Sequence, residues 1–390
     1  MKKLSFLLLS LRSFLNLSSK NTTKDDILTM KKIFSLICIL LFSFYAYPQK
    51  KLMSDKRLAK EKTYTTLPEA LENPDKVYKL DLSKHPFDDF PMRIIQFKNL
   101  QELTLNEAGV FEIPKEIEKL TNLQSLTINR NRLRQLPKEI GNLKNLRVLE
   151  LKNNQINTLP TEIKDLVNLQ ELDLSFNPVT ELLPEIGELK NLKKLKLSFS
   201  LLKEFPSSIG KLANLRVLEI SNLSYLERLP VEIANLKNLE VLDITKVSYN
   251  LVIEDRFNEI TQLTKLTNLI LYGTNLQKFP NNLYKLTALR ELNLQANPKL
   301  DIKTILPQLE NLPNLYNLDL SENDLQELPE EIGKLGNVKE LNLSLNKLKT
   351  LPDAIGNMKQ LKQLNLTVNK IPESENARIK KLLPNCSISF

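Results

Sequence analysis

The sequence predicts one elongated repeat array of the α/β class, and three observations support this prediction. From Val77 onward the chain is self-similar with a period of 23 residues. Each unit opens with the pattern L-x-x-L-x-L, whose alternation is typical of a short half-buried strand. Proline recurs 14 residues after most unit starts, where it opens a helical turn. We therefore expect one repeat array and not the two or three separate domains that the length of the chain alone suggests.

The repeat comprises thirteen units, numbered 1 to 13, in which positions are counted from the first residue as zero. Successive starts are 23 residues apart, except that units 7, 8 and 10 have 24, 27 and 26 residues. The starts are Val77, Leu100, Leu123, Leu146, Leu169, Leu192, Leu215, Leu239, Leu266, Leu289, Leu315, Val338 and Leu361.

Asparagine recurs at position 8 of most units. Its amide both donates and accepts hydrogen bonds, so a stacked column can satisfy backbone groups where each strand ends. We call this column the asparagine ladder; its members are Asn131, Asn154, Asn177, Asn297, Asn323, Asn346 and Asn369. The prolines are followed by E-I-G-x-L, with an apolar pair at helical spacing, and five of the eight glycines fall at position 18. These glycines are expected to be structural.

The units resemble 23-residue leucine-rich repeats, L-x-x-L-x-L-x-x-N-x-L-x-x-L-P-x-x-I-x-x-L, of the bacterial type that includes secreted spirochaete proteins. The resemblance covers residues 66–390. It implies a curved, horseshoe-shaped solenoid with a parallel sheet on the concave face and short helices on the convex face. It also implies a repeat protein that binds proteins and is not an enzyme.

The N-terminal region has the composition of a targeting segment. Met30-Lys31-Lys32 precedes an apolar run from Ile33 to Phe44, which is followed by Ala46. A charged start, a run of this length and a small residue describe a signal peptide, whereas a membrane span needs about 20 residues. We therefore expect a signal at 30–46 within an N-terminal extension 1–46, and no integral span in the mature chain.

The remaining boundaries follow from the repeat. We expect a basic tether at 47–65, and an N-terminal cap at 66–76 that is the convex half of a unit without its own strand. The thirteen repeats occupy 77–371, and a C-terminal cap occupies 372–390. Caps are required because an open solenoid end would expose its core.

Positions 2, 4, 6 and 7 of the units define the predicted concave surface. Its apolar groups gather in units 5–9, where the asparagine ladder is interrupted by Ser200, Leu223, Val247 and Thr274. Sequence rules tend to fail at functional sites, and aromatic side chains dominate interfaces. The candidate partner-binding residues are Phe176, Phe199, Tyr225, Tyr249, Ile270, Tyr272, Asp173, Lys196, Glu219 and Asp243. Two alternatives stay open: Phe176 and Phe199 turn inward, or the sequence drift is neutral.

The charge of the chain is concentrated at one end. The formal net charge is +9, but residues 1–65 hold 13 Lys+Arg against four Asp+Glu, so residues 66–390 are neutral. The predicted concave surface holds twelve acids and seven bases. Nucleic-acid binders present a basic stripe, so we expect no nucleic-acid partner.

Composition excludes most catalytic and metal chemistry. The chain has one histidine, His85, and two cysteines, Cys38 and Cys386, so no multi-histidine or four-cysteine metal site is possible. We expect no catalytic residues, no metal and no cofactor.

The leading function is an exported, secreted or surface module that binds a protein, with a host-surface protein as one candidate partner. The alternative is a cytoplasmic scaffold or regulator of a signalling enzyme. A monomer is expected, with self-association left open.

Overall fold

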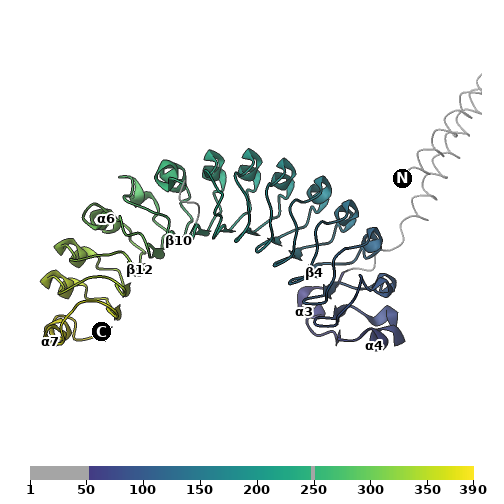
Figure 1. Ribbon diagram of the computed structural model, residues 1–390, viewed down its shortest axis with the longest axis horizontal. Coiled ribbons are helices and arrows are strands. Elements are labelled where there is room, and N and C mark those ends of the chain that lie inside the picture. The colour runs from purple at the N-terminus through teal and green to yellow at the C-terminus, as the bar shows by residue number, and fades with distance from the viewer. Residues whose placement is uncertain (1–51, 247–250) are drawn as a thin grey trace, which may run out of the picture. The chain divides into compact units, whose positions relative to one another are not determined.

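The computed structural model describes residues 52–246 and 251–390. The chain divides into two compact units, residues 1–57 and 58–390. Helix α3 (Asp55–Leu58) ends at their junction. Residues 58–390 form a curved solenoid with strands along its inner face and helical turns along its outer face (Figure 1). This architecture confirms the predicted fold class.

The inner face is a single parallel sheet whose strands follow the order of the chain. Each strand from β2 to β14 covers positions 2 to 4 of one unit, and the middle residue of every one is a buried leucine. The strands are β1 (Thr63–Tyr64), β2 (Lys79–Asp81), β3 (Glu102–Thr104), β4 (Ser125–Thr127), β5 (Val148–Glu150), β6 (Glu171–Asp173), β7 (Lys194–Lys196), β8 (Val217–Glu219), β9 (Val241–Asp243), β10 (Asn268–Ile270), β11 (Glu291–Asn293), β12 (Asn317–Asp319), β13 (Glu340–Asn342), β14 (Gln363–Asn365) and β15 (Ser387–Ser389).

The outer face is built mostly of 3₁₀ turns. Only about five residues separate the proline of a 23-residue unit from the next buried leucine, and short helical segments of this kind favour 3₁₀ geometry. The turns are η1 (Pro74–Lys76), η2 (Met92–Gln96), η3 (Lys115–Lys119), η4 (Lys138–Asn142), η5 (Thr161–Asp165), η6 (Pro184–Glu188), η7 (Ser207–Lys211), η8 (Val231–Asn235), η9 (Ile253–Arg256), η10 (Leu283–Lys285), η11 (Glu330–Lys334) and η12 (Asp353–Asn357).

The two longest units carry α-helices on the outer face. Unit 8 adds α5 (Phe257–Ile260) directly after η9, and unit 10 forms α6 (Ile302–Leu309) in place of a 3₁₀ turn. The extra length in these two units therefore leaves the strand register unchanged: Leu242, Leu269, Leu292 and Leu318 remain paired across β9 to β12.

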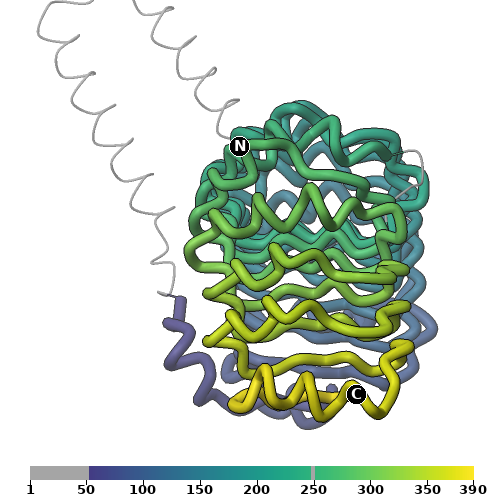
Figure 2. Tube along the Cα trace, turned by 90° about the vertical axis from the view of Figure 1, so that its left-hand side faces the viewer, coloured from purple at the N-terminus to yellow at the C-terminus, as the bar shows by residue number. Residues whose placement is uncertain are grey.

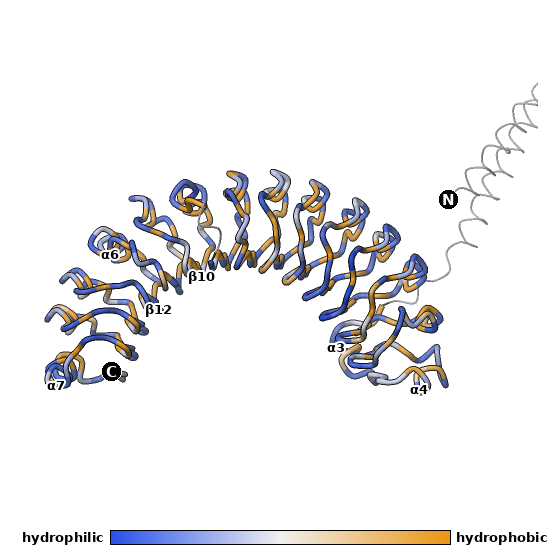
Figure 3. Tube along the Cα trace, viewed as in Figure 1, coloured by the Kyte–Doolittle hydropathy of each residue, from blue (hydrophilic) through white to orange (hydrophobic). Residues whose placement is uncertain are grey.

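The core is one continuous column between the two faces. Apolar side chains from every unit belong to a single buried cluster. Figure 3 shows hydrophobic segments recurring at the same places in successive coils, and Figure 2 shows those coils stacked on one another. Gly141 allows this stacking on the outer side, because a Cβ there would lie 2.5 Å from the Glu162 carbonyl oxygen.

The N-terminal end corrects one prediction. The half-unit at 66–76 contains α4 (Leu67–Glu72) and η1, but it is preceded by β1, which pairs with β2. The expectation of a cap without its own strand is therefore wrong. Tyr64 explains the difference, because its side chain is 9% exposed and contributes to the core. The range predicted as a tether, 47–65, thus contains ordered elements in its described part.

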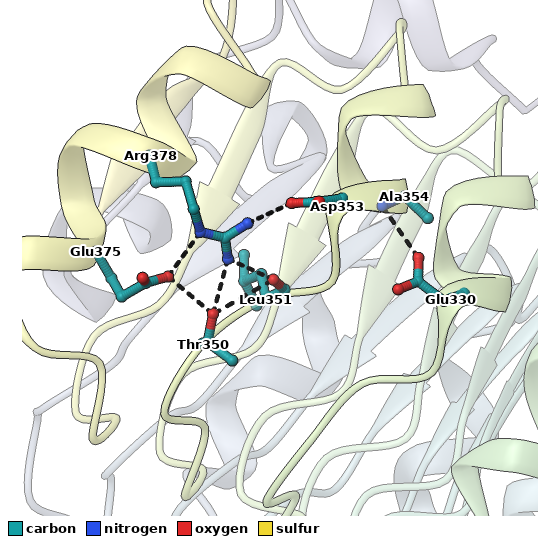
Figure 4. A network of polar contacts seen from close by, with 7 residues as sticks. All are labelled: Glu330, Thr350, Leu351, Asp353, Ala354, Glu375 and Arg378. Atoms are coloured by element: carbon teal, nitrogen blue, oxygen red, sulfur yellow. Dashed lines mark hydrogen bonds and ion pairs between the residues drawn. The ribbon is translucent and has the colours of Figure 1, made fainter.

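The C-terminal end consists of α7 (Glu373–Leu382) and β15, which pairs with β14. Arg378 of α7 ties this helix to the preceding unit (Figure 4). Its guanidinium lies 2.9 Å from Glu375 Oε2 and 2.6 Å from Asp353 Oδ1, and it also donates to Thr350 Oγ1 and the Leu351 carbonyl. The helix thereby covers the end of the core, where Ile379 is fully buried.

Candidate functional site

The concave face carries a row of residues with left-handed backbone at its edge. Position 7 has positive φ, between 46° and 63°, in all thirteen units. Its N–H commonly donates to the carbonyl of the next unit, as from Phe176 to Ser198 and from Phe199 to Ser221. Asparagine and glycine adopt this conformation at little cost, whereas bulky side chains do not. Large apolar residues in this row are therefore unexpected on structural grounds alone.

Phe176 and Phe199 occupy this row in units 5 and 6. Their side chains are 40% and 48% exposed, so the alternative that they turn inward does not hold. The two rings are stacked, with centroids 4.1 Å apart and planes 16° from parallel. Lys152 Nζ lies 5.2 Å from the Phe176 ring centroid, a cation–π geometry. A three-layer stack of one cation and two rings thus stands on the edge of the concave face.

The other predicted apolar residues occupy different places. Tyr272 and Ile270 are half-buried in unit 9, and Lys246 Nζ lies 4.7 Å from the Tyr272 ring centroid. Tyr225 is 56% exposed beyond β8. Tyr249 lies outside the described residues. The structure therefore places two aromatic groups on the concave face, the Phe176–Phe199 stack and Tyr272, with units 7 and 8 between them.

Two of the four predicted charged residues, Lys196 and Glu219, form an ion pair within the face. Lys196 Nζ lies 3.1 Å from Glu219 Oε1, and Lys194 makes a bridge of the same length to Glu171. Burial by itself lowers the pKa of Lys196, but the hydrogen bond to Glu219 and nearby carboxylates outweigh it and raise the pKa above its ordinary value. Lys196 therefore remains charged and compensates its acidic neighbours.

Two of the predicted acids shape the strand ends. Asp173 Oδ1 accepts the N–H of Ser175, and Asp243 Oδ1 accepts both the N–H and the hydroxyl of Thr245. An acid or amide at position 4 bonded to position 6 recurs in other units, as in Asp319 with Ser321. Local structure therefore explains the presence of Asp173 and Asp243 without a role in partner binding.

The asparagine ladder lies behind this face and links the units. Each ladder amide donates to a position 5 carbonyl of the preceding unit, as Asn154 Nδ2 does to Ile128 O at 2.7 Å. Its Oδ1 accepts a backbone N–H of that unit, from Leu133 in the same case. Between Asn177 and Asn297 these bonds are interrupted: Ser200 is buried and its Oγ has no hydrogen-bond partner among the described residues.

Sequence reasoning did not single out Lys152 and Lys246 as parts of the site. The repeat places both on the concave surface, but only the tertiary structure shows that each covers one aromatic ring. The signal available in the sequence was their register: Lys152 precedes Phe176 by one unit, and Lys246 precedes Tyr272 by one unit.

Within residues 52–246 and 251–390, no group of three or more His, Cys, Asp or Glu side chains could hold a metal ion. In the same part of the chain, no helix combines the length and apolarity needed to span a bilayer.

Comparison with known proteins assigns the family. The family described as leucine-rich repeat region matches residues 136–224 and 198–320, and the family described as leucine rich repeat matches 313–371. A solved structure of a leucine-rich-repeat protein from Leptospira interrogans is 34% identical, with a TM-score of 0.64, over 84% of this chain and 100% of that one. The chain belongs to the leucine-rich-repeat family. No curated protein sequence gives a significant match.

More distant leucine-rich-repeat structures share the fold alone. The Toll–Spätzle complex from Drosophila matches with 23% identity and a TM-score of 0.64, over 81% of this chain and 43% of that one. An internalin from Listeria monocytogenes matches with 19% identity and a TM-score of 0.50, over 81% and 87% of the two chains. Leucine-rich-repeat proteins are generally non-catalytic scaffolds that bind proteins, and this repeat protein has the same architecture.

Proposed function

We propose that this leucine-rich-repeat protein is a non-catalytic binding module that holds a protein partner on its concave face. The observation that carries the proposal is the Phe176–Phe199 stack, which is half-exposed on a left-handed backbone. Buried aromatic side chains supply much of the energy at protein interfaces, and concave solenoid faces offer extended binding surfaces. The stack, Tyr272 and the side chains between them form the proposed contact region.

The energetics of the free protein support a role in binding. A left-handed backbone costs a bulky residue about 1–2 kcal/mol, and the mutual stacking of two rings returns only about 0.5–1.5 kcal/mol. Two phenylalanines therefore cost more than they contribute at these exposed positions, where Asn153 and Asn222 of the flanking units fit without strain. Strain retained at a surface is characteristic of functional sites.

Affinity capture with a triple variant tests this proposal. Replacing Phe176, Phe199 and Tyr272 by alanine should weaken binding of a captured partner by about 2 kcal/mol or more, roughly 30-fold, as expected for hot-spot residues. The measurement is a binding titration of wild-type and variant full chain with the same purified partner.

The matched control removes three apolar or aromatic side chains of similar exposure that lie outside the concave face. Phe111, Val231 and Tyr284 are 47%, 50% and 53% exposed, and none occupies positions 2, 4, 6 or 7 of a unit. Their replacement by alanine should leave the affinity unchanged. Equal binding by wild type and the concave-face triple variant would reject the proposed site.

We further propose that the protein is exported and meets its partner outside the cytoplasm, with a host-surface protein as one candidate. The support is the signal-like segment at 30–46, which lies outside the described residues, and the similarity to a leucine-rich-repeat protein of the spirochaete Leptospira interrogans. The resemblance to secreted spirochaete-type repeats points in the same direction.

Cell fractionation with N-terminal sequencing of the mature chain tests export. We expect the protein in the extracytoplasmic fraction, with an N-terminus that follows the apolar run ending at Phe44. A cytoplasmic chain that retains Met30 would favour the alternative, a scaffold or regulator of a signalling enzyme.

A further inference from the structure

The stack at the edge of the concave face has two chemically different ends. On one side Lys152 Nζ lies over the Phe176 ring. On the other side Phe199 has no second ring and no lysine or arginine nitrogen over it among the described residues, although its side chain is 48% exposed. The aromatic face of Phe199 that points away from Phe176 is therefore available to a ligand.

The next side chain in the same row is short. Asn222 follows Phe199 by one unit, and its φ of 57° matches the 58° and 59° of Phe176 and Phe199. Adjacent strands are about 4.8 Å apart, close to the separation of stacked rings. A ring placed above Asn222 would therefore continue the stack in register.

Charges around this position are already satisfied within the protein. Lys194 and Lys196 bridge Glu171 and Glu219, whereas Lys246 lies over Tyr272. Asp243, the strand neighbour of Glu219, accepts two hydrogen bonds from Thr245. A charged ligand group would have to compete with these internal partners, whereas an uncharged ring would not. The open face of Phe199 thus offers its contact to an uncharged aromatic group.

We propose, on the basis of the protein-binding function proposed above, that the partner inserts an aromatic side chain over Asn222 and stacks it on the open face of Phe199. The inserted ring becomes the next layer after Lys152, Phe176 and Phe199. Recognition at this point depends on stacking and desolvation, so it changes little with ionic strength.

Two single substitutions at equivalent backbone positions test the assignment. Asn222→Phe supplies the missing layer from within the protein and should block the site. Asn153→Phe places the same residue next to Phe176, at the other end of the stack, where Lys152 already covers Phe176, and should leave the site open. The two positions have φ values of 57° and 58°, so the backbone cost of both changes is matched. Circular dichroism and thermal melts establish that both variants are folded.

The probe is N-acetyl-phenylalaninamide, titrated against the full chain by ligand-observed saturation-transfer NMR. N-acetyl-leucinamide and N-acetyl-argininamide serve as comparison ligands. We expect the aromatic amide to bind about fivefold more tightly than either, which corresponds to one stacking contact. Asn222→Phe should weaken its binding by about fivefold, and Asn153→Phe should leave it unchanged.

Three outcomes would overturn the assignment: no preference for the aromatic amide, a preference for the arginine amide, or equal binding to wild type and Asn222→Phe. These outcomes are distinguishable from failure of the protein-binding function, which is measured with a protein partner and the concave-face triple variant. A partner that binds Asn222→Phe as tightly as wild type but loses affinity for the triple variant would retain the function and exclude the inserted ring.

Discussion

At the residue scale, position 7 at the edge of the concave face holds two kinds of residue. Some suit its left-handed backbone, and others lower the stability of the fold there. Asn153 and Asn222 suit the left-handed backbone of position 7, whereas Phe176, Phe199 and Val368 do not. Because the backbone is imposed by the repeat, the cost of a bulky residue there is independent of its neighbours. The identity of the residue at position 7 therefore affects the stability of each unit.

Val368 gives the simplest test of this cost, because it is 68% exposed and β-branched, with φ of 57°. Val368→Asn should raise the free energy of unfolding by about 1 kcal/mol, since asparagine tolerates the left-handed region. Val167→Asn is the matched control: Val167 is 51% exposed and its φ is not positive, so little change is expected. Urea denaturation measures both. An equal effect of the two changes would contradict the proposed backbone strain.

At the element scale, both ends of the sheet add a strand and bury apolar side chains: β1 with Tyr64 at one end, and β15 with Ile379 of α7 at the other. At the C-terminal end, α7 also makes polar contacts with the last outer turn. Glu375 takes part in these contacts: its hydrogen bonds to Thr350 and Arg378 hold the pKa of its carboxyl below the ordinary value. The C-terminal cap should therefore depend on pH.

Arg378→Ala removes the centre of this network and should lower the free energy of unfolding by about 1–2 kcal/mol, because several hydrogen bonds are lost together. A lowered folded-state pKa means that Glu375 stabilises the cap above its unfolded pKa of about 4.3, and that this contribution is lost as pH falls through the lower folded value. Urea midpoints of wild type and variant should therefore differ at pH 6 and converge towards pH 3.

Arg228→Ala is the control for this prediction. Arg228 and Glu204 form an exposed pair at 3.5 Å, with side chains 70% and 68% exposed, and such pairs contribute about 0–1 kcal/mol. A loss at Arg228 equal to that at Arg378, or an Arg378 effect that does not change with pH, would show that the network does not stabilise the cap.

At the scale of the whole molecule, the solenoid is continuous in its core but interrupted in its polar contacts. The buried cluster runs through every unit, whereas the asparagine ladder lacks rungs between Asn177 and Asn297. The interruption lies behind the aromatic groups of units 5–9. The ladder there is replaced by residues such as Ser200 and Leu223, so the proposed contact region coincides with the part of the array that departs most from the repeat.

The sequence by itself determined the solenoid, the strand register and the positions of the buried leucines, because a repeated alternation of apolar residues admits only one stacking that buries them all. It also placed Phe176 and Phe199 next to each other. It could not determine that position 7 is left-handed, that Lys152 covers Phe176, or that β1 extends the sheet. These features arise from contacts between units. The geometry of such contacts depends on how each coil packs against the next, so only the tertiary structure decides it.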